Sequence, residues 1–366
     1  MSISYAVGMM SGTSMDGTDA VCVRFIEHRF DKVIAHVHRE FDDKLITSLL
    51  ALQDESFGEL KQSKLLANTL TQNYIETAKA LFRLPEMENI EIEAVGCHGQ
   101  TVRHAPQDGY SIQLANWALL AEHLKLPVVG DFRAADIAAA GQGAPLVPAF
   151  HQMLFAKTNV TRVVVNIGGI ANITILNSDG SVSGFDTGPG NMLLDAFVRK
   201  YFNLPFDKDG EIAKSGHENT ELLKQLLSFP YFAAKAPKST GRDTFSLAWL
   251  EKYLPDKFDC SDILHTLTKL TAYTITQAIQ QYAPDCSEII LCGGGTYNNF
   301  LYQSIQQQLP NIKISNSGEH NLPVMQVESS AFAWLAHCRI HRIPANLPSA
   351  TGAIGKRILG AVWDCC

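Results

Sequence analysis

The sequence predicts a duplicated α/β fold, because a strand that ends in a glycine-bearing turn occurs in both halves of the chain. Tyr5 to Met10 and Ala20 to Phe25 are apolar runs of strand length that flank a polar turn, which is the pattern of a β-hairpin. Thr161 to Asn166, Gly168-Gly169 and Asn172 to Leu176 repeat this pattern about half a chain later. Two such hairpins indicate two copies of one α/β unit.

A third strand followed by glycines strengthens this prediction. Glu288 to Cys292 leads into Gly293-Gly294-Gly295-Thr296, and a helix opens near Asn298. Glycine-rich turns expose backbone N–H groups and let the backbone approach a ligand closely. We therefore expect a nucleotide in a cleft between the two copies, with adenine or ribose beside the glycines after the third strand. Neither a P-loop motif nor a GxGxxG turn opens a helix, which argues against P-loop and Rossmann folds.

The first turn, Ser11 to Asp19, carries two carboxylates, those of Asp16 and Asp19. Carboxylates repel phosphate, so beside an anion-binding turn they are expected only with a hard cation such as Mg2+ between them. Taken alone, the turn fits a polar hairpin tip without a ligand equally well. Its repetition at Gly168-Gly169 favours the ligand site.

Composition narrows the class of protein. The 366 residues are enough for two domains, and a hydrophobic content of 46% with 18% charged residues is typical of a folded soluble protein. A net charge of −7 without a long basic run argues against nucleic-acid binding. Neither a signal-peptide pattern nor an apolar run of membrane-spanning length occurs, and the eight cysteines form no CxxC pair. We expect a cytoplasmic protein with reduced thiols and no membrane partner.

Two further strand ends carry polar side chains suited to a small substrate. Glu93 to Cys97 leads into His98 and Gln100, and Leu126 to Gly130 leads into Asp131 and Arg133. Open α/β sheets bind ligands at the carboxyl ends of their strands. The planar guanidinium of arginine matches a carboxylate. An ordinary polar loop and an Asp131–Arg133 surface ion pair are the alternatives.

Asp186 is the candidate general base. It follows strand-like sequence and precedes a helix, in a turn that contains glycines and a proline, Gly184 to Asn191. A carboxylate held there would face the predicted cleft. The alternative is a helix-capping aspartate, although Asn191 lies closer to the helix start.

The pattern of apolar residues in the rest of the chain predicts further helices and the boundaries of two lobes. Helices are expected over 43–52, 60–81 and 331–339, over 262–282 with Ser261 as its cap, and at the end of the chain over 354–362. The first lobe is predicted to comprise residues 1–128 and 343–366, and the second lobe residues 129–342.

Taken together, the motifs resemble those of the anhydro-N-acetylmuramic acid kinase family, within the actin, Hsp70 and sugar kinase superfamily. The matching stretches run in family order through nearly the whole chain. They are GMMSGTSMDGTDA (8–20), CHGQTVRH (97–104), GDFRAADIAAAGQGAPLVPAFH (130–151), NIGGIAN (166–172), GFDTGPGNMLLDAF (184–197), APKSTGRDTF (236–245), LCGGGTYN (291–298) and VESSAFAWLA (327–336).

The resemblance implies a two-lobed actin-like sugar kinase fold, a ribonuclease H-like unit in duplicate, with ATP and Mg2+ in a central cleft. The implied reaction opens 1,6-anhydro-N-acetylmuramic acid with water and phosphorylates O6, which gives N-acetylmuramate 6-phosphate and ADP in cell-wall recycling. A homodimer is also implied.

Under this resemblance the candidate residues take particular roles. Asp186 is the general base that activates water, Glu328 helps to orient that water, and Asp16 holds Mg2+. His98, Gln100, Asp131 and Arg133 are placed on the sugar and its lactyl carboxylate. The nucleotide-binding set comprises Gly12, Thr13, Ser14, Met15, Asp16, Gly17, Thr18, Asp19, Asn166, Gly168, Gly169, Gly293, Gly294 and Gly295.

Two other functions fit parts of the pattern. One is a kinase of the same architecture acting on another anhydrosugar such as levoglucosan. The other is a nucleotide-gated binding protein of the actin or Hsp70 type. The HGQ, DFR and DTGPGN motifs disfavour the latter, since a filament or chaperone has no need of them.

Overall fold

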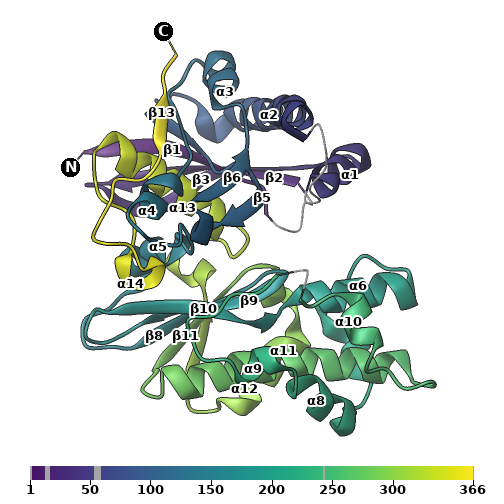
Figure 1. Ribbon diagram of the computed structural model, residues 1–366. Coiled ribbons are helices and arrows are strands. Elements are labelled where there is room, and N and C mark those ends of the chain that lie inside the picture. Colours follow the sequence, from purple (N-terminus) through teal and green to yellow (C-terminus); the bar gives the residue numbers. More distant parts are fainter. Residues whose placement is uncertain (1, 13–16, 53–58, 242–243, 366) are drawn as a thin grey trace. The chain divides into compact units, whose positions relative to one another are not determined.

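The chain folds into two compact units, seen in a computed structural model that describes residues 2–12, 17–52, 59–241 and 244–365 (Figure 1). The first unit comprises Met1–Leu154 and Asn321–Cys366, and the second comprises Phe155–His320. Each unit is a mixed α/β body with its own sheet and its own core.

The sheet of the first unit has the order β13-β7-β4-β1-β2-β3. Strands β1, β2 and β3 form an antiparallel meander, whereas β4 and β7 continue the sheet parallel to β1, and β13 pairs antiparallel with β7. The strands are β1 (Ile3–Met10), β2 (Gly17–Ile26), β3 (Arg29–Glu40), β4 (Ala94–Cys97), β7 (Val128–Gly130) and β13 (Ala361–Trp363). A separate hairpin, β5 (Gln100–Ala105) and β6 (Tyr110–Leu114), follows β4.

The second unit repeats this strand order. Its sheet runs β10-β9-β8-β11-β12, with β8, β9 and β10 antiparallel and with β11 and β12 parallel to β8. The strands are β8 (Arg162–Ile167), β9 (Ile170–Leu176), β10 (Val182–Pro189), β11 (Glu288–Cys292) and β12 (Lys313–Asn316). Because β3-β2-β1-β4-β7 and β10-β9-β8-β11-β12 match in order and direction, the predicted duplication is confirmed.

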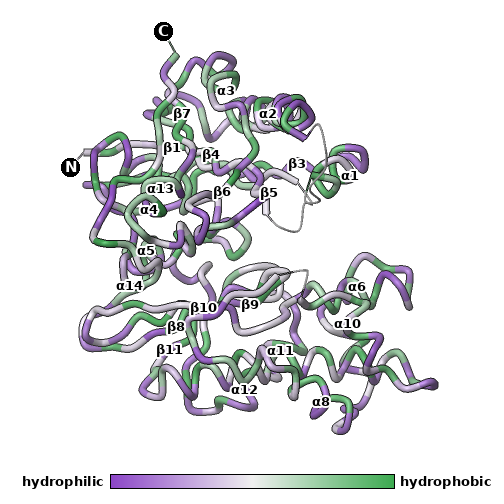
Figure 2. Tube along the Cα trace, in the orientation of Figure 1, coloured by the Kyte–Doolittle hydropathy of each residue, from purple (hydrophilic) through white to green (hydrophobic). Residues whose placement is uncertain are grey.

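Helices cover both sheets, and their apolar sides form the cores (Figure 2). In the first unit they are α1 (Asp43–Ala51), α2 (Glu59–Phe82), α3 (Trp117–Leu124), α4 (Ala134–Ala138), α13 (Val327–Ile340) and α14 (Pro348–Thr351), and α5 (Val147–Phe155) ends at the unit boundary. In the second unit they are α6 (Asn191–Phe202), α7 (Glu211–Ser215), α8 (Thr220–Leu227), α9 (Pro230–Ala233), α10 (Leu247–Glu251), α11 (Cys260–Tyr282) and α12 (Asn299–Gln308). No helix in the described ranges is both long and apolar enough to cross a membrane.

Helix α13 is held tightly against the sheet of the first unit. A Cβ added to Gly8 of β1 would lie 1.9 Å from the Ser329 carbonyl oxygen, and one added to Gly96 of β4 would lie 2.1 Å from the Phe332 carbonyl oxygen. Since glycine alone permits this approach, α13 is part of the first unit. The unit boundaries at 154/155 and 320/321 therefore differ from the predicted 128/129 and 342/343.

Two local predictions are wrong. The helix expected over 354–362 is instead a loop that leads into β13, and Gly355 and Gly360 within it adopt left-handed φ values of 83° and 85°. The long helix α11 is capped by Asp259, whose carboxylate accepts the Ser261 N–H at 2.7 Å, and not by Ser261. Asp259 lies one residue ahead of the helix, where its side chain reaches the unsatisfied N–H groups of the first turn.

Candidate functional site

In the first unit, His98 and Arg133 lie side by side at the carboxyl ends of β4 and β7. Arg133 donates through Nη2 to His98 Nε2 at 2.9 Å and through Nη1 to the Gly143 carbonyl oxygen at 2.7 Å. Burial and the neighbouring guanidinium hold the pKa of His98 well below its usual value, so the imidazole is neutral and accepts at Nε2. The sequence-predicted pairing of these two strand ends is thus present.

Glu328, in the first turn of α13, belongs to the same group. Burial lowers the pKa of Arg133 to about 10, and the negative charge of Glu328 partly offsets this effect. The packing of α13 on the sheet brings Glu328 close to Arg133, although the two residues are 195 positions apart in the sequence.

Three buried atoms in this group have no hydrogen-bond partner among the described residues. They are Nδ1 of His98, Oε1 of Gln100 and Nε of Arg133. The amide of Gln100 also donates from Nε2 to the Gly12 carbonyl oxygen at 3.4 Å, which links β5 to the start of the first turn. Buried polar atoms are almost always paired, so these three atoms fit a polar ligand or an ordered water.

Asp131 does not take part in the contact between His98 and Arg133. It adopts a left-handed φ of 49° directly after β7, and within the described residues no ion pair joins it to Arg133. Burial raises the pKa of its carboxyl group, and a hydrogen bond from the Ala134 N–H opposes that rise. The surface ion pair considered as an alternative is therefore absent there, and Asp131 is a partly buried carboxylate beside the arginine.

A buried aspartate, Asp136, stabilises the loop that holds Arg133. Asp136 accepts from the Gly143 N–H, the Asn346 side chain and the Thr351 hydroxyl, each at 2.8 Å, and its side chain is fully buried. Asp136 thereby fixes the loop whose Gly143 carbonyl oxygen holds Arg133. This role of Asp136 could not be predicted from neighbouring residues, because two of the three donors come from the far end of the chain.

Part of the predicted first turn can be placed. Thr13, Ser14, Met15 and Asp16 lie outside the described residues, so the structure does not address the predicted magnesium ligand. Asp19 lies on β2, where its Oδ1 contacts His36 Nε2 at 2.7 Å and His38 Nδ1 at 3.2 Å. This cross-strand contact with β3 was not predicted. Of the other predicted residues here, Gly17 packs on the Arg39 carbonyl oxygen, and the Thr18 hydroxyl is buried without a partner among the described residues.

The second hairpin has a two-residue turn, Gly168-Gly169, between β8 and β9. The Gly168 carbonyl oxygen accepts the Asn191 N–H at 2.8 Å, and the Gly169 carbonyl oxygen accepts the N–H groups of Gly190 and Met192 at 2.9 and 3.1 Å. In a trans peptide the N–H points opposite to the carbonyl, so the N–H of Gly169 points away from α6. Among the described residues, a Cβ on Gly168 or Gly169 would meet no atom closer than 3.6 Å outside its chain neighbours. The protein's own packing therefore leaves room on this turn.

Asp186 lies on β10 and is not a helix cap, because α6 begins at Asn191. Its Oδ2 accepts the Thr240 N–H at 3.0 Å, and its own carbonyl oxygen accepts the Tyr231 hydroxyl at 2.7 Å. Burial raises the pKa of Asp186 to about 6, although the Thr240 N–H opposes the rise. Such a carboxylate is ionised at neutral pH and is a stronger base than an exposed aspartate.

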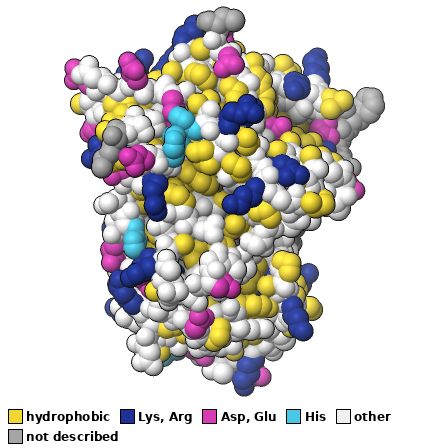
Figure 3. All heavy atoms as spheres, turned by 90° about the vertical axis from the view of Figure 1, so that its left-hand side faces the viewer, with side chains coloured by type: hydrophobic (Ala, Val, Ile, Leu, Met, Phe, Trp, Pro, Cys, Tyr) yellow, Lys and Arg dark blue, Asp and Glu magenta, His cyan; other side chains and the backbone are white. Residues whose placement is uncertain are grey.

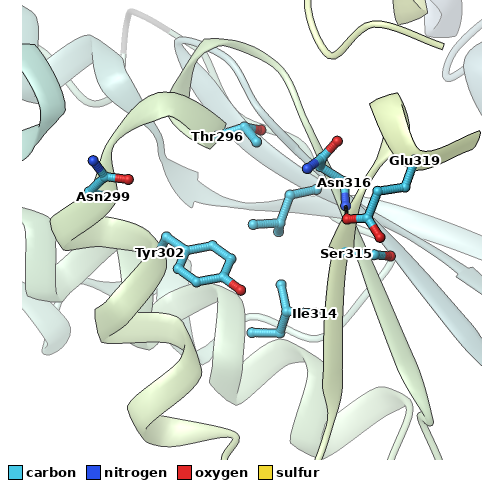
Figure 4. A pocket seen from close by; sticks show the side chains of 8 residues that line it. Thr296, Asn299, Tyr302, Ile314, Ser315, Asn316 and Glu319 are labelled. Atoms are coloured by element: carbon cyan, nitrogen blue, oxygen red, sulfur yellow. Dashed lines mark hydrogen bonds between the residues drawn. The ribbon is translucent and has the colours of Figure 1, made fainter. Parts of the chain in front are cut away.

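A pocket of about 250 Å3 opens in the second unit beside the ends of β11 and β12 (Figure 4). Its lining comes from the turn after β11, from α12, from β12 and from the turn that follows β12. The lining residues are Leu291, Thr296, Asn299, Tyr302, Ile314, Ser315, Asn316 and Glu319. The volume is near the lower end for small-molecule pockets, and the mixture of an aromatic ring with amide, hydroxyl and carboxylate groups suits a flat polar heterocycle.

The predicted glycines after β11 do not line this pocket. A Cβ on Gly293 would lie 2.5 Å from Asn166 Oδ1, and one on Gly295 would lie 2.2 Å from the Ile167 side chain. Close packing against the end of β8 thus requires glycine at both positions. The lining side chains Thr296, Asn299 and Tyr302 were missed, although their place directly after a strand that ends in glycines is a usable signal.

The duplicated sheets, with their matching strand order, are those of the actin-like sugar kinase fold. The chain belongs to the anhydro-N-acetylmuramic acid kinase family, whose profile matches residues 4–365. The anhydro-N-acetylmuramic acid kinase of Neisseria meningitidis serogroup C is 47% identical over 356 residues, which is 97% of each chain. The Nitrosomonas europaea enzyme is 47% identical over 361 residues, covering 98% of this chain and 99% of its own.

Two solved structures align with most of this chain, but at low sequence identity and low TM-score. One is a Clostridium difficile activator of 2-hydroxyisocaproyl-CoA dehydratase with bound ADPNP, at 12% identity and a TM-score of 0.46, covering 92% of this chain and 96% of its own. Another is a Streptomyces griseus ROK family glucokinase in complex with glucose and AMPPNP, at 13% identity and a TM-score of 0.41, covering 91% and 99%. The fold class rests on the strand order of the two units and not on these overlaps.

Proposed function

We propose that this enzyme uses ATP to open 1,6-anhydro-N-acetylmuramic acid with water and to phosphorylate O6, which gives N-acetylmuramate 6-phosphate and ADP. Family membership supports the reaction, and the observation that carries the assignment to residues is the partly buried carboxyl group of Asp186, whose pKa is raised by burial to about 6. The anhydro bridge leaves O6 without a free hydroxyl, so one bond must be cleaved as another forms.

The proposed chemistry divides between two ends of the C1–O6 bond. Asp186 accepts a proton from the water that attacks C1, while O6 leaves C1 and bonds to the γ-phosphorus, which releases ADP. The Thr240 N–H fixes one carboxylate oxygen of Asp186, so the other is available to the water. Glu328 is proposed to orient this water.

The phosphates are proposed to lie on the backbone of the two hairpin turns. Phosphoryl transfer depends mainly on positioning and charge neutralisation, which outward-pointing N–H groups supply. Asp16 remains the proposed magnesium ligand. Asp19, the other carboxylate of the first turn, is already in contact with His36 and His38 and is less suited to a metal. The pocket of Thr296, Asn299 and Tyr302 is proposed for adenosine.

Gly169→Ala separates a ligand role of the second hairpin from a packing role. Among the described residues the added methyl meets Met192 Cβ alone, at 3.7 Å, so the free energy of unfolding should change little, whereas the methyl would intrude on a bound phosphate. We expect KM for ATP to rise by about 10-fold or more, which corresponds to about 1.4 kcal/mol. Gly190→Ala is the matched control, because its methyl would lie 2.3 Å from the Gly168 carbonyl oxygen and should lower the melting temperature. Unchanged KM in a folded Gly169→Ala enzyme would remove this turn from the phosphate site.

Arg133, with His98, Gln100 and Asp131, is proposed to bind the sugar and its lactyl carboxylate. The alternative substrate, levoglucosan, has no lactyl group. Comparing turnover of the two sugars therefore tests whether Arg133 binds the lactyl carboxylate. Removing one partner of a buried charge-assisted pair costs about 2–5 kcal/mol. Arg133→Met should therefore lower kcat/KM for anhydro-N-acetylmuramic acid by at least 30-fold, as about 1.4 kcal/mol is tenfold.

The control is turnover of levoglucosan by the unaltered enzyme and by Arg133→Met. We expect the natural enzyme to prefer the muramyl sugar strongly and Arg133→Met to lose most of that preference. Equal losses on both sugars would mean that Arg133 shapes the pocket without meeting a carboxylate. Faster turnover of levoglucosan by the unaltered enzyme would favour the alternative function.

A further inference from the structure

Three histidines meet in the first unit at the end of the sheet opposite to His98 and Arg133. His28 lies in the turn between β2 and β3, His337 lies in the last turn of α13, and His341, four residues later, directly follows that helix. One ligand atom from each side chain lies within 4.8 Å of the other two. Ile3 at the start of β1 pairs with Ile26, two residues before His28, whereas Gly12 follows the other end of β1. Eight strand residues at about 3.3 Å each put roughly 25 Å between the two ends.

The side chains of this cluster already have the orientation of a ligand set. His28 Nδ1 and His337 Nε2 face each other at 3.0 Å. Glu93, directly before β4, contacts His337 through Nδ1 and accepts from His341 Nε2 at 2.9 Å. With Nδ1 of His337 on the carboxylate, the lone pair of Nε2 is directed toward His28. A carboxylate on the far nitrogen is the usual way in which a protein orients a metal-binding histidine.

We propose that His28, His337 and His341 form a binding site for a divalent late transition ion, with Zn2+ as the expected occupant, and that Glu93 positions His337. Imidazole nitrogens are ligands of this class of ion and not of Mg2+ or Ca2+. At Zn–N distances of 2.0–2.1 Å, tetrahedral ligands lie about 3.3 Å apart, so His28 and His337 need to separate by only a few tenths of an ångström. The third nitrogen has to move by about 1.5 Å, and His341 is a half-exposed side chain able to do so.

Two further observations agree with this site. Glu27 and His28 both adopt left-handed backbone, with φ of 49° and 66°, in a two-residue turn that usually favours asparagine and glycine. A surface cavity of about 460 Å3 lies on the other side of Ser4 and Glu93, two residues that line it and that also contact His337. Histidine side chains reach the surface beside an acidic side chain on the face in Figure 3. Because His28 and His341 are exposed, an ion can reach the cluster from the surface.

The ion would join the β2–β3 turn to the end of α13, two segments 309 residues apart in sequence. Its role is to hold the first unit together, since the cluster lies at the opposite end of the sheet from the proposed sugar and phosphate groups. The competing explanation is a hydrogen-bonded histidine–glutamate network that binds no ion.

The test is metal binding by the full-length chelator-treated protein, read by calorimetry with Zn2+ alone and by the visible spectrum with Co2+. We expect one ion per chain, Co2+ bands of a tetrahedral nitrogen site, and a rise in melting temperature on adding Zn2+. His28→Asn and His341→Asn should each abolish this binding. Glu93→Gln should weaken it by about 10–100-fold, the usual effect of losing the carboxylate behind a ligating histidine.

His123→Asn, an exposed histidine of α3, is the matched control and should bind like the unaltered protein. His28 and His341 are surface side chains, so their variants should fold, which the melting temperature without metal verifies. Absence of stoichiometric Zn2+ binding, or binding that survives both His28→Asn and His341→Asn, would overturn the proposal. None of these measurements uses turnover, so they are independent of the proposed reaction.

Discussion

Asp186→Asn should lower kcat by at least about 100-fold, the lower limit for removing a general base. The asparagine keeps the shape of the side chain and still accepts the Thr240 N–H, but it cannot take a proton from water. KM for ATP should change little, because Asp186 is assigned to the sugar end of the reaction. Steady-state kinetics with both substrates varied measures the two effects separately.

The pH dependence of kcat is a second test of the role of Asp186. Burial raises the pKa of Asp186 to about 6, and the base must be ionised to act. In the unaltered enzyme kcat should therefore fall about tenfold per pH unit below pH 6, whereas the residual activity of Asp186→Asn should lose this acid limb. Asp195 on α6 is the matched control, because burial raises the pKa of its carboxyl to about 6 as well, and Asp195→Asn should keep the limb. A limb lost in Asp195→Asn and kept in Asp186→Asn would reassign the base.

Asp136→Ala should destabilise the first unit by about 3 kcal/mol. The substitution leaves the Gly143 N–H, the Asn346 amide and the Thr351 hydroxyl without their buried acceptor, and an unpaired buried donor costs about 1–3 kcal/mol. The melting temperature should fall by roughly 6–12 °C, since about 1 kcal/mol shifts a domain of this size by 2–4 °C. Thermal unfolding measures the loss.

The same variant should also weaken sugar binding, because the Gly143 carbonyl oxygen holds Arg133. We expect KM for the sugar to rise while KM for ATP stays close to its normal value at a temperature where the variant is folded. Asp108→Ala, which removes an exposed aspartate of the same unit, should change neither stability nor KM. A melting temperature that matches the unaltered enzyme would show that water replaces Asp136.

Much of the fold could be predicted from local patterns. The two hairpins, strand β11 and helices α2, α11 and α13 follow from apolar periodicity and glycine turns, to within a few residues of their observed ends. Asp186 could be predicted to lie outside the cap of α6, because it stands too far ahead of Asn191, and its role as a base stays a proposal. Each of these inferences needs only neighbouring residues.

The remainder depends on contacts that a single sequence does not record. Asp136 meets Thr351 across 215 positions, and His28 meets His337 across 309 positions. The place of α13 in the first unit depends on Gly8 and Gly96, whose missing side chains let the helix approach the sheet. β13 is a short strand that pairs only at an edge, and its apolar residues fit a helix equally well. The spacing His337–His341 is the one local sign of the histidine cluster, since residues four positions apart are neighbours at a helix surface.

In the proposed reaction, water opens the C1–O6 bond while O6 receives the phosphoryl group. The most direct measurement is mass spectrometry of the product formed from ATP and anhydro-N-acetylmuramic acid in 18O-labelled water. The proposed reaction puts one labelled oxygen on C1 of a sugar 6-phosphate and none in the phosphate group. Label in released inorganic phosphate without a phosphosugar, or a 6-phosphate with an unlabelled C1 hydroxyl, would contradict it.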